Sequence, residues 1–189
     1  AKGETKVVKL SSLDPKLRLI ITDKKEKINQ KFDKDIKIGI ITIPSFYADF
    51  SAVQTGNPNA KTLTTDVMNI LMDMRKNNID GLILDLRSNG GGSLEESIRL
   101  TGLFIPKGPV VQICSGKGMN PRVKEDHSGI TFYSGPLIVM VNKFSASASE
   151  IFAGAIQDYN RGIIVGDQKT HGKGTVQTVF DLDRLLRLP

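Results

Sequence analysis

Two short segments of the chain carry the residue types of nucleophilic catalysis, a serine cluster and a lysine between two glycines. Residues 144–151 read Phe-Ser-Ala-Ser-Ala-Ser-Glu-Ile, and residues 170–177 read Thr-His-Gly-Lys-Gly-Thr-Val-Gln. A serine hydroxyl is a weak nucleophile until a neighbouring base removes its proton. The pattern predicts a serine hydrolase whose base is Lys173, and it leaves open which of Ser145, Ser147 and Ser149 attacks.

A lysine can act as this base only when its amine is neutral near pH 7. That requires burial to lower its pKa by about 3 units from ~10.4, because a buried ammonium loses its hydration. In an extended segment Lys173 and Gln177 share a face, so the glutamine amide can orient the amine. His171 lies close enough in sequence to remain a second candidate base.

The serine cluster follows an apolar stretch, residues 136–142, and precedes a helical pattern that reaches about residue 159. A helix start offers unpaired N–H groups and a partial positive charge, both of which stabilise an oxyanion. A second turn reads Asp-Leu-Arg-Ser-Asn-Gly-Gly-Gly-Ser over residues 85–93. We expect one of its glycine N–H groups to complete an oxyanion hole, and Asp85 to pair with Arg87 or to brace the loops.

The glycines also suggest a phosphate site, but the spacing argues against it. Gly174 stands where a phosphate loop needs Ser or Thr after its lysine, and one residue too many separates Gly166 from Gly172. The turn at residues 85–93 lacks the Gly-x-Gly-x-x-Gly spacing of dinucleotide sites. A plain tight turn remains the alternative for each glycine segment.

These turns are set in alternating apolar strands and amphipathic helices, which predicts an α/β layer structure. The predicted strands are residues 7–10, 17–22, 36–43, 81–86, 109–113, 136–142, 162–165 and 175–180. Three helices are predicted. The first begins after residue 64 or 65, either of which can cap it. The second covers residues 94–104, and the third extends from the serine cluster to about residue 159. Residues 114–129 are polar and glycine-rich and are predicted to form a loop.

Composition narrows the function further. The net charge is +6, but residues 1–38 carry 11 Lys and Arg against 6 Asp and Glu, so the rest is nearly balanced. That basic segment lacks the interleaved aromatic residues that stack on bases, which argues against nucleic-acid binding. One cysteine and two histidines cannot supply the usual zinc ligands, and we expect neither a metal nor a cofactor.

The three turns together resemble those of the C-terminal processing peptidases, most closely the bacterial tail-specific proteases. The similarity runs from about residue 36 to residue 180. It implies that Ser147, the middle serine, is the nucleophile, that Lys173 is its base and that Gln177 assists the lysine. It also implies an oxyanion hole made by the N–H groups of Ala148 and of either Gly91 or Gly92.

The resemblance further implies a ClpP/crotonase-like core of ββα units. Residues 1–35 are then the closing strands of a PDZ domain and a linker, and residues 36–189 are the peptidase core, cut at its C-terminus. The chain begins at Ala1 rather than Met, so we expect a processed or excised piece. Two departures are His171, where an aromatic residue is common, and a turn before Lys173 that is one residue longer.

The resemblance implies a serine endopeptidase that cuts proteins with apolar C-terminal tails through an acyl-enzyme. Its partners would be such protein or peptide substrates, with an adaptor or further copies of the chain, in the bacterial periplasm or envelope. Two alternatives stay open: a non-catalytic binding module or inactive fragment on the same fold, and an acyl-CoA hydrolase or isomerase.

Overall fold

The computed structural model describes residues 1–8, 36–114 and 120–175, with only the backbone for residues 5–8. Several sequence predictions therefore lie outside the described residues: the second half of the strand at 7–10, the strand at 17–22, the linker up to residue 35, most of the strand at 175–180, and the position of Gln177.

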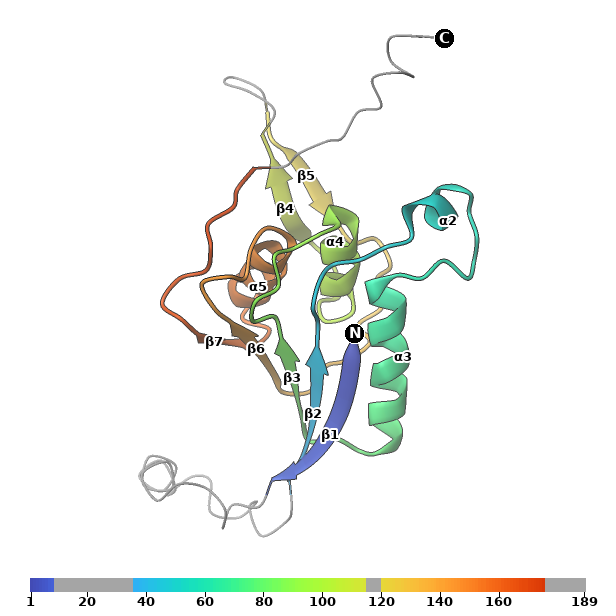
Figure 1. Ribbon diagram of the computed structural model, residues 1–189, viewed down its shortest axis with the longest axis vertical. Coiled ribbons are helices and arrows are strands. Elements are labelled where there is room, and N and C mark those ends of the chain that lie inside the picture. Colours follow the sequence, from blue (N-terminus) through green and yellow to red (C-terminus); the bar gives the residue numbers. More distant parts are fainter. Residues whose placement is uncertain (9–35, 115–119, 176–189) are drawn as a thin grey trace.

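A five-stranded sheet in the order β1-β2-β3-β6-β7 forms the centre of the molecule (Figure 1). Its strands are β1 (Lys2–Val8), β2 (Ile36–Thr42), β3 (Gly81–Asp85), β6 (Leu137–Val141) and β7 (Ile163–Gly166). β1 pairs antiparallel with β2, and the other neighbours pair in parallel. The predicted α/β class is confirmed, with a mostly parallel sheet.

Three helices pack onto one hydrophobic core with this sheet. They are α3 (Leu63–Lys76), α4 (Leu94–Gly102) and α5 (Ala148–Asp158); a short helix, α2 (Phe50–Gln54), lies apart from the core. Alternate residues of the central strands are fully buried in this core, such as Ile41, Leu84 and Val139. Because successive side chains of a strand point to opposite faces of the sheet, these buried residues form the face that packs against the helices.

Helix α3 shows how the sequence fixes an element. Its N-cap is Thr62, whose side chain accepts a hydrogen bond from Thr65 N, so the prediction of a cap at residue 64 or 65 was wrong. The error is small because three threonines stand together at 62, 64 and 65, and only the residue with extended backbone angles can cap. Val67, Leu71 and Met74 form the buried stripe.

Two further elements correct the sequence analysis. Residues 114–129 contain a strand, β5 (Arg122–Glu125), which pairs antiparallel with β4 (Pro109–Ile113). All four residues of β5 are exposed, so the segment has no apolar alternation that would have signalled a strand. Helix α2 was not predicted, since its five residues bury no side chain.

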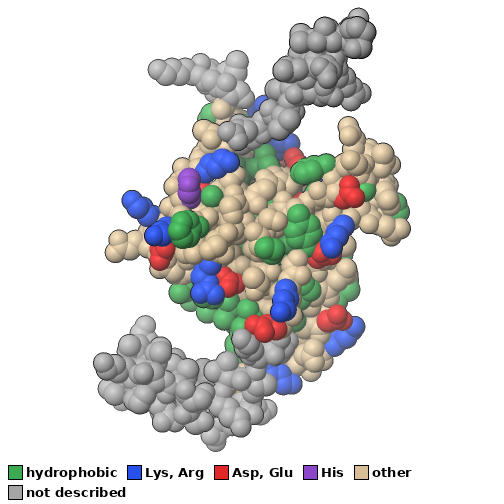
Figure 2. All heavy atoms as spheres, in the orientation of Figure 1, with side chains coloured by type: hydrophobic (Ala, Val, Ile, Leu, Met, Phe, Trp, Pro, Cys, Tyr) green, Lys and Arg blue, Asp and Glu red, His purple; other side chains and the backbone are tan. Residues whose placement is uncertain are grey.

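Side chains of both charges alternate over the face shown in Figure 2, where Lys and Arg lie among Asp and Glu. None of the described helices is both long and apolar enough to cross a membrane. β1 joins the same sheet as the rest of the core, and its assignment to a PDZ domain stays a prediction.

Candidate active site

The three turns that carry the predicted chemistry meet at one edge of the sheet. β3, β6 and β7 are parallel neighbours, and the glycine turn, the serine turn and the lysine loop each follow the carboxyl end of one of them. Parallel strands place such loops side by side, which is why ligands of open α/β sheets bind at this edge.

Ser147 occupies a strained position at the start of α5. Its backbone angles are φ 58° and ψ −115°, a region that residues with a side chain seldom adopt. Such a conformation costs on the order of 1–3 kcal/mol and is found mostly where function requires it. The sharp turn from strand to helix presents the Ser147 side chain to solvent, and the residue is only half-buried.

The structure separates the three serines that the sequence left equivalent. Ser145 and Ser149 are fully buried, and their hydroxyls donate to Leu86 O at 2.8 Å and to Asn89 O at 3.0 Å. Both hydroxyls therefore hold the turn together. Ser147 alone of the three lines a surface cavity.

Glu150 connects the serine turn to the lysine loop. Its carboxylate accepts hydrogen bonds from Ser147 N at 2.8 Å, Gly172 N at 2.6 Å and Lys173 N at 2.9 Å, and from the Thr170 hydroxyl at 2.6 Å. The sequence analysis did not single out this residue. The signal was present, because Ser-x-x-Glu before an apolar helix is the capping-box pattern.

These bonds set the charge of the Glu150 side chain. Partial burial raises the pKa of this carboxyl group, but the hydrogen bonds from Thr170, Gly172, Ser147 and Lys173 outweigh it, and the net shift is downward. The group is therefore an anion at neutral pH. It holds the backbone of both catalytic candidates in one arrangement.

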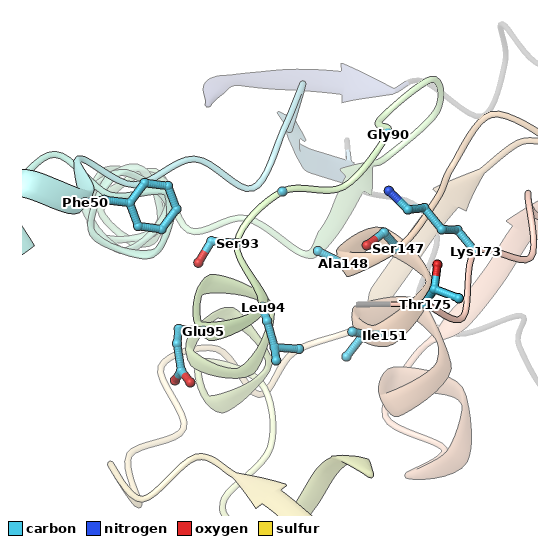
Figure 3. A pocket seen from close by; sticks show the side chains of 11 residues that line it. Phe50, Gly90, Ser93, Leu94, Glu95, Ser147, Ala148, Ile151, Lys173 and Thr175 are labelled. Atoms are coloured by element: carbon cyan, nitrogen blue, oxygen red, sulfur yellow. The ribbon is translucent and has the colours of Figure 1, made fainter. Parts of the chain in front are cut away.

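Lys173 reaches the same cavity as Ser147. Figure 3 shows its side chain extending from the loop, with the amine directed toward the space between Ser147 and Gly90. His171 stays outside this cavity, and its backbone N–H donates to Ser145 O at 3.0 Å. Lys173 is exposed, so the described part of the chain does not supply the burial that a neutral amine requires.

The glycine turn lies directly against the serine turn and is held by Asn89. A Cβ on Gly91 would lie 2.8 Å from Ser147 Cβ. The Gly91 N–H donates to Asn89 Oδ1 at 2.8 Å, whereas the N–H groups of Gly92 and Ala148 have no acceptor among the described residues. Gly92 is thus the better oxyanion-hole candidate of the two glycines.

Asn89 is a second residue that the sequence analysis missed. It is fully buried, its side-chain NH₂ group donates to Ile43 O at 2.8 Å, and its backbone carbonyl oxygen accepts from Ala146 N at 2.9 Å. The predicted pairing of Asp85 with Arg87 is confirmed by two bonds, at 2.9 and 2.7 Å, between the guanidinium and the carboxylate.

The cavity has a volume of about 670 Å³ and is open to solvent. Figure 3 shows the side chains that line it. It is lined by Ser147, Ala148, Lys173, Gly90 and Gly92, and also by Phe50, Ser93, Leu94, Glu95, Ile151 and Thr175. No group of three or more His, Cys, Asp or Glu side chains in the described ranges is arranged to hold a metal ion. The arrangement suits acyl transfer by a hydroxyl beside an amine.

Known proteins are similar to this chain in sequence and in fold. The chain is 46% identical over 165 residues to the tail-specific protease of Haemophilus influenzae, covering 84% of this chain and 21% of that protein. It is 39% identical over 146 residues to the chloroplastic carboxyl-terminal-processing peptidase 2 of Arabidopsis thaliana, covering 77% of this chain and 26% of that one. The chain thus spans about a quarter or less of each.

Among solved structures, the photosystem II D1 C-terminal processing protease superposes with a TM-score of 0.66 at 27% identity, covering 95% of this chain and 39% of that chain. The model of the family described as Peptidase family S41 matches residues 37–189. On this match, and on the relatives that share it, the chain belongs to peptidase family S41.

Proposed function

We propose that this chain is the core of a serine endopeptidase that cleaves proteins with apolar C-terminal tails through an acyl-enzyme on Ser147. The observation that carries the proposal is the strained Ser147 lining one cavity with Lys173, while Glu150 binds the backbone of both residues. The names of the Haemophilus and Arabidopsis relatives, a tail-specific and a carboxyl-terminal-processing peptidase, support the choice of C-terminal tails, and the apolar character of those tails is part of the proposal.

In the first half of the reaction Lys173, as the neutral amine, accepts the Ser147 proton while Oγ attacks the scissile carbonyl carbon. The N–H groups of Ala148 and Gly92 stabilise the oxyanion, each contributing about 2.7–4 kcal/mol. The Lys173 ammonium then gives its proton to the leaving amine, and the C–N bond breaks. An acyl ester on Ser147 remains.

In the second half Lys173 takes a proton from water as the water oxygen attacks the ester carbonyl. Ser147 leaves with that proton, and the carboxylic acid product departs. A substrate lying in the cavity covers the exposed Lys173 amine and removes water from it, which favours the neutral form. Gln177 is proposed to orient this amine.

The remaining expectations belong to the same proposal: a ClpP/crotonase-like core over residues 36–189, a PDZ remnant and linker over residues 1–35, and a place in the bacterial envelope. One observation favours the alternative of a non-catalytic binding module, namely the exposure of Lys173 in this structure. Peptide cleavage distinguishes the peptidase from the binding module.

The test is cleavage of a peptide with an apolar C-terminal tail, followed by mass spectrometry. Ser147→Ala should lower kcat by about 10⁴-fold or more, and Lys173→Ala should act similarly, since the two residues work as one unit. Ser145→Ala and Ser149→Ala are the matched controls. They should lose stability by about 0.5–1.5 kcal/mol, because each removes a buried hydroxyl and its hydrogen bond, while Leu86 O and Asn89 O keep the backbone N–H groups of Asn89 and Ala146 as donors. They should keep the activity of their folded fraction.

Equal cleavage by the wild-type chain and by Ser147→Ala would end the proposal. Binding of the same peptide by both, with no cleavage by either, would establish the binding module instead.

A further inference from the structure

Residues 49–61 form an arm that projects from the core and carries the short helix α2 (Figure 1). Its base is closed by a hydrogen bond from Asp49 N to Lys61 O at 2.9 Å and by an antiparallel bridge between Ala48 and Thr62. Above this base, the hydrogen bonds that the arm makes with described residues all stay within the arm. The arm is therefore pinned at one end and can swing as a unit.

One aromatic side chain of this arm faces the catalytic cavity. Phe50, the first residue of α2, is 68% exposed and lines the same cavity as Ser147 and Lys173. Figure 3 shows its ring on the opposite side of the cavity from both residues. A single exposed apolar side chain is common on a protein surface. This one, however, lies across an open cavity from the nucleophile, on a segment that can move.

We propose that the arm closes over a bound substrate, and that Phe50 then covers the substrate backbone and keeps bulk water from Ser147 and Lys173. The proposal rests on the proposed peptidase function. Closure supplies what the open cavity lacks, because Lys173 is exposed and a neutral amine requires the removal of water. The apolar surface that Phe50 and the substrate hide from water favours the closed state.

Phe50 is thus a positioning residue, which acts on Lys173 through the solvent. It covers the substrate from the side away from the lysine, so its effect should be similar for peptides of different sequence. After the leaving amine departs with its part of the substrate, the water of the second half-reaction takes the space that is vacated.

The first test follows closure without cleavage. The chain contains no tryptophan, so Phe50→Trp places one fluorescent reporter on the arm. In full-chain protein that also carries Ser147→Ala, a peptide with an apolar C-terminal tail stays intact, and calorimetry measures its binding. Saturation with this peptide should shift the indole emission to shorter wavelength, because closure removes the ring from water.

Val53→Trp in the same Ser147→Ala background is the matched control. Val53 lies on the same helix and is 38% exposed, but it does not line the cavity. Its emission should stay unchanged when the peptide binds.

The second test measures cleavage at pH 7. Phe50→Ala should lower kcat by about tenfold, the effect of one unit in the pKa of Lys173 on the fraction of neutral amine. Phe50→Leu should restore most of the loss, since leucine is also apolar, and Val53→Ala should match the wild type. Phe50 is outside the hydrophobic core, so all these variants should unfold at the wild-type temperature.

The outcomes separate the lid from the peptidase. Peptide binding with no change in the Phe50→Trp emission, or with an equal shift for Val53→Trp, would overturn the lid and leave the peptidase. Wild-type kcat in Phe50→Ala would do the same. Cleavage that survives Ser147→Ala, or no binding of the peptide at all, would remove both proposals.

Discussion

At the scale of single residues, the side chain that couples the two catalytic candidates is Glu150. Its two oxygens accept three backbone N–H groups and one hydroxyl, from two loops that approach each other only in the folded chain. A glutamine keeps the size of this side chain but turns one acceptor into a donor. Some of these donors would then face an NH₂ group and lose their partner.

Glu150→Gln should therefore lower kcat by about 10²-fold with little change in KM, because a displacement of the lysine near 1 Å is enough for that loss. Unfolding in urea should show a decrease of about 1–3 kcal/mol at pH 7. Glu95→Gln is the matched control: Glu95 lines the same cavity, but its side chain is 60% exposed and contacts Lys124 rather than the loops. It should change both quantities little.

The pH dependence of this stability follows from the lowered pKa of Glu150. A carboxyl group whose pKa is lower in the folded state stabilises the fold above its unfolded pKa of about 4.3. That contribution is lost as the pH falls through the folded value. The difference in unfolding free energy between wild type and Glu150→Gln should accordingly shrink in acid, and a difference that grows there would contradict the role of the carboxylate.

At the scale of elements, the turn between β3 and α4 depends on Gly92 more than on Gly90. Gly92 has φ 143°, and a Cβ there would lie 2.3 Å from Phe46 O. Gly90 lines the same cavity, yet a Cβ on it would meet nothing within 4 Å. Substitution of Gly92 therefore tests the backbone geometry of the turn, whereas substitution of Gly90 tests only an added side chain in the cavity wall.

Gly92→Ala should destabilise the protein by about 2 kcal/mol or more, since the left-handed backbone and the contact with Phe46 both resist a side chain. Cleavage should fall with it, because the turn and its N–H group move. Gly90→Ala should leave the unfolding transition within about 0.5 kcal/mol of wild type. Equal stability of the two variants, measured by urea unfolding, would show that the turn is not fixed by Phe46.

The elements themselves were predictable where the apolar pattern is strong. The predicted strands at residues 81–86 and 136–142 are built on the apolar runs 82–84 and 137–141, and they became β3 and β6 almost to the residue. β5 was missed because its stability comes from pairing with β4 and not from burial of its own side chains. The cap at Thr62 was missed because the choice among nearby threonines depends on backbone angles that a sequence does not show.

At the scale of the whole molecule, the order of the strands decides which turns meet. The sequence gives each turn its residues, but only the pairing of β3 with β6 and of β6 with β7 brings Gly92, Ser147 and Lys173 into one cavity. The resemblance to a family pointed to those residues. Asn89 was missed because its bonds to Ile43 and Ala146 join segments far apart in sequence. The capping-box pattern marks Glu150 as a helix cap, but its bonds to the lysine loop appear only in the fold.

The hydrophobic core also supports the serine turn and the glycine turn. Phe152 of α5 contacts Phe46 and Phe104, with ring centroids 6.5 and 5.8 Å away. The backbone of Phe46 in turn bonds to the glycine turn, through Phe46 N to Gly91 O at 2.9 Å and Ser93 N to Phe46 O at 2.7 Å. One aromatic cluster therefore supports both the serine helix and the oxyanion-hole turn.

Phe152→Ala should lower the unfolding free energy by about 3–5 kcal/mol, because it leaves a cavity in the centre of this cluster. That is a large part of the 5–15 kcal/mol typical of a domain, so activity should disappear at a lower temperature than in the wild type. Phe144→Ala is the matched control: Phe144 is 57% exposed and should shift the transition by less than about 0.5 kcal/mol. Urea unfolding followed by circular dichroism measures both variants, and equal losses in the two would mean that the aromatic cluster does not hold the site.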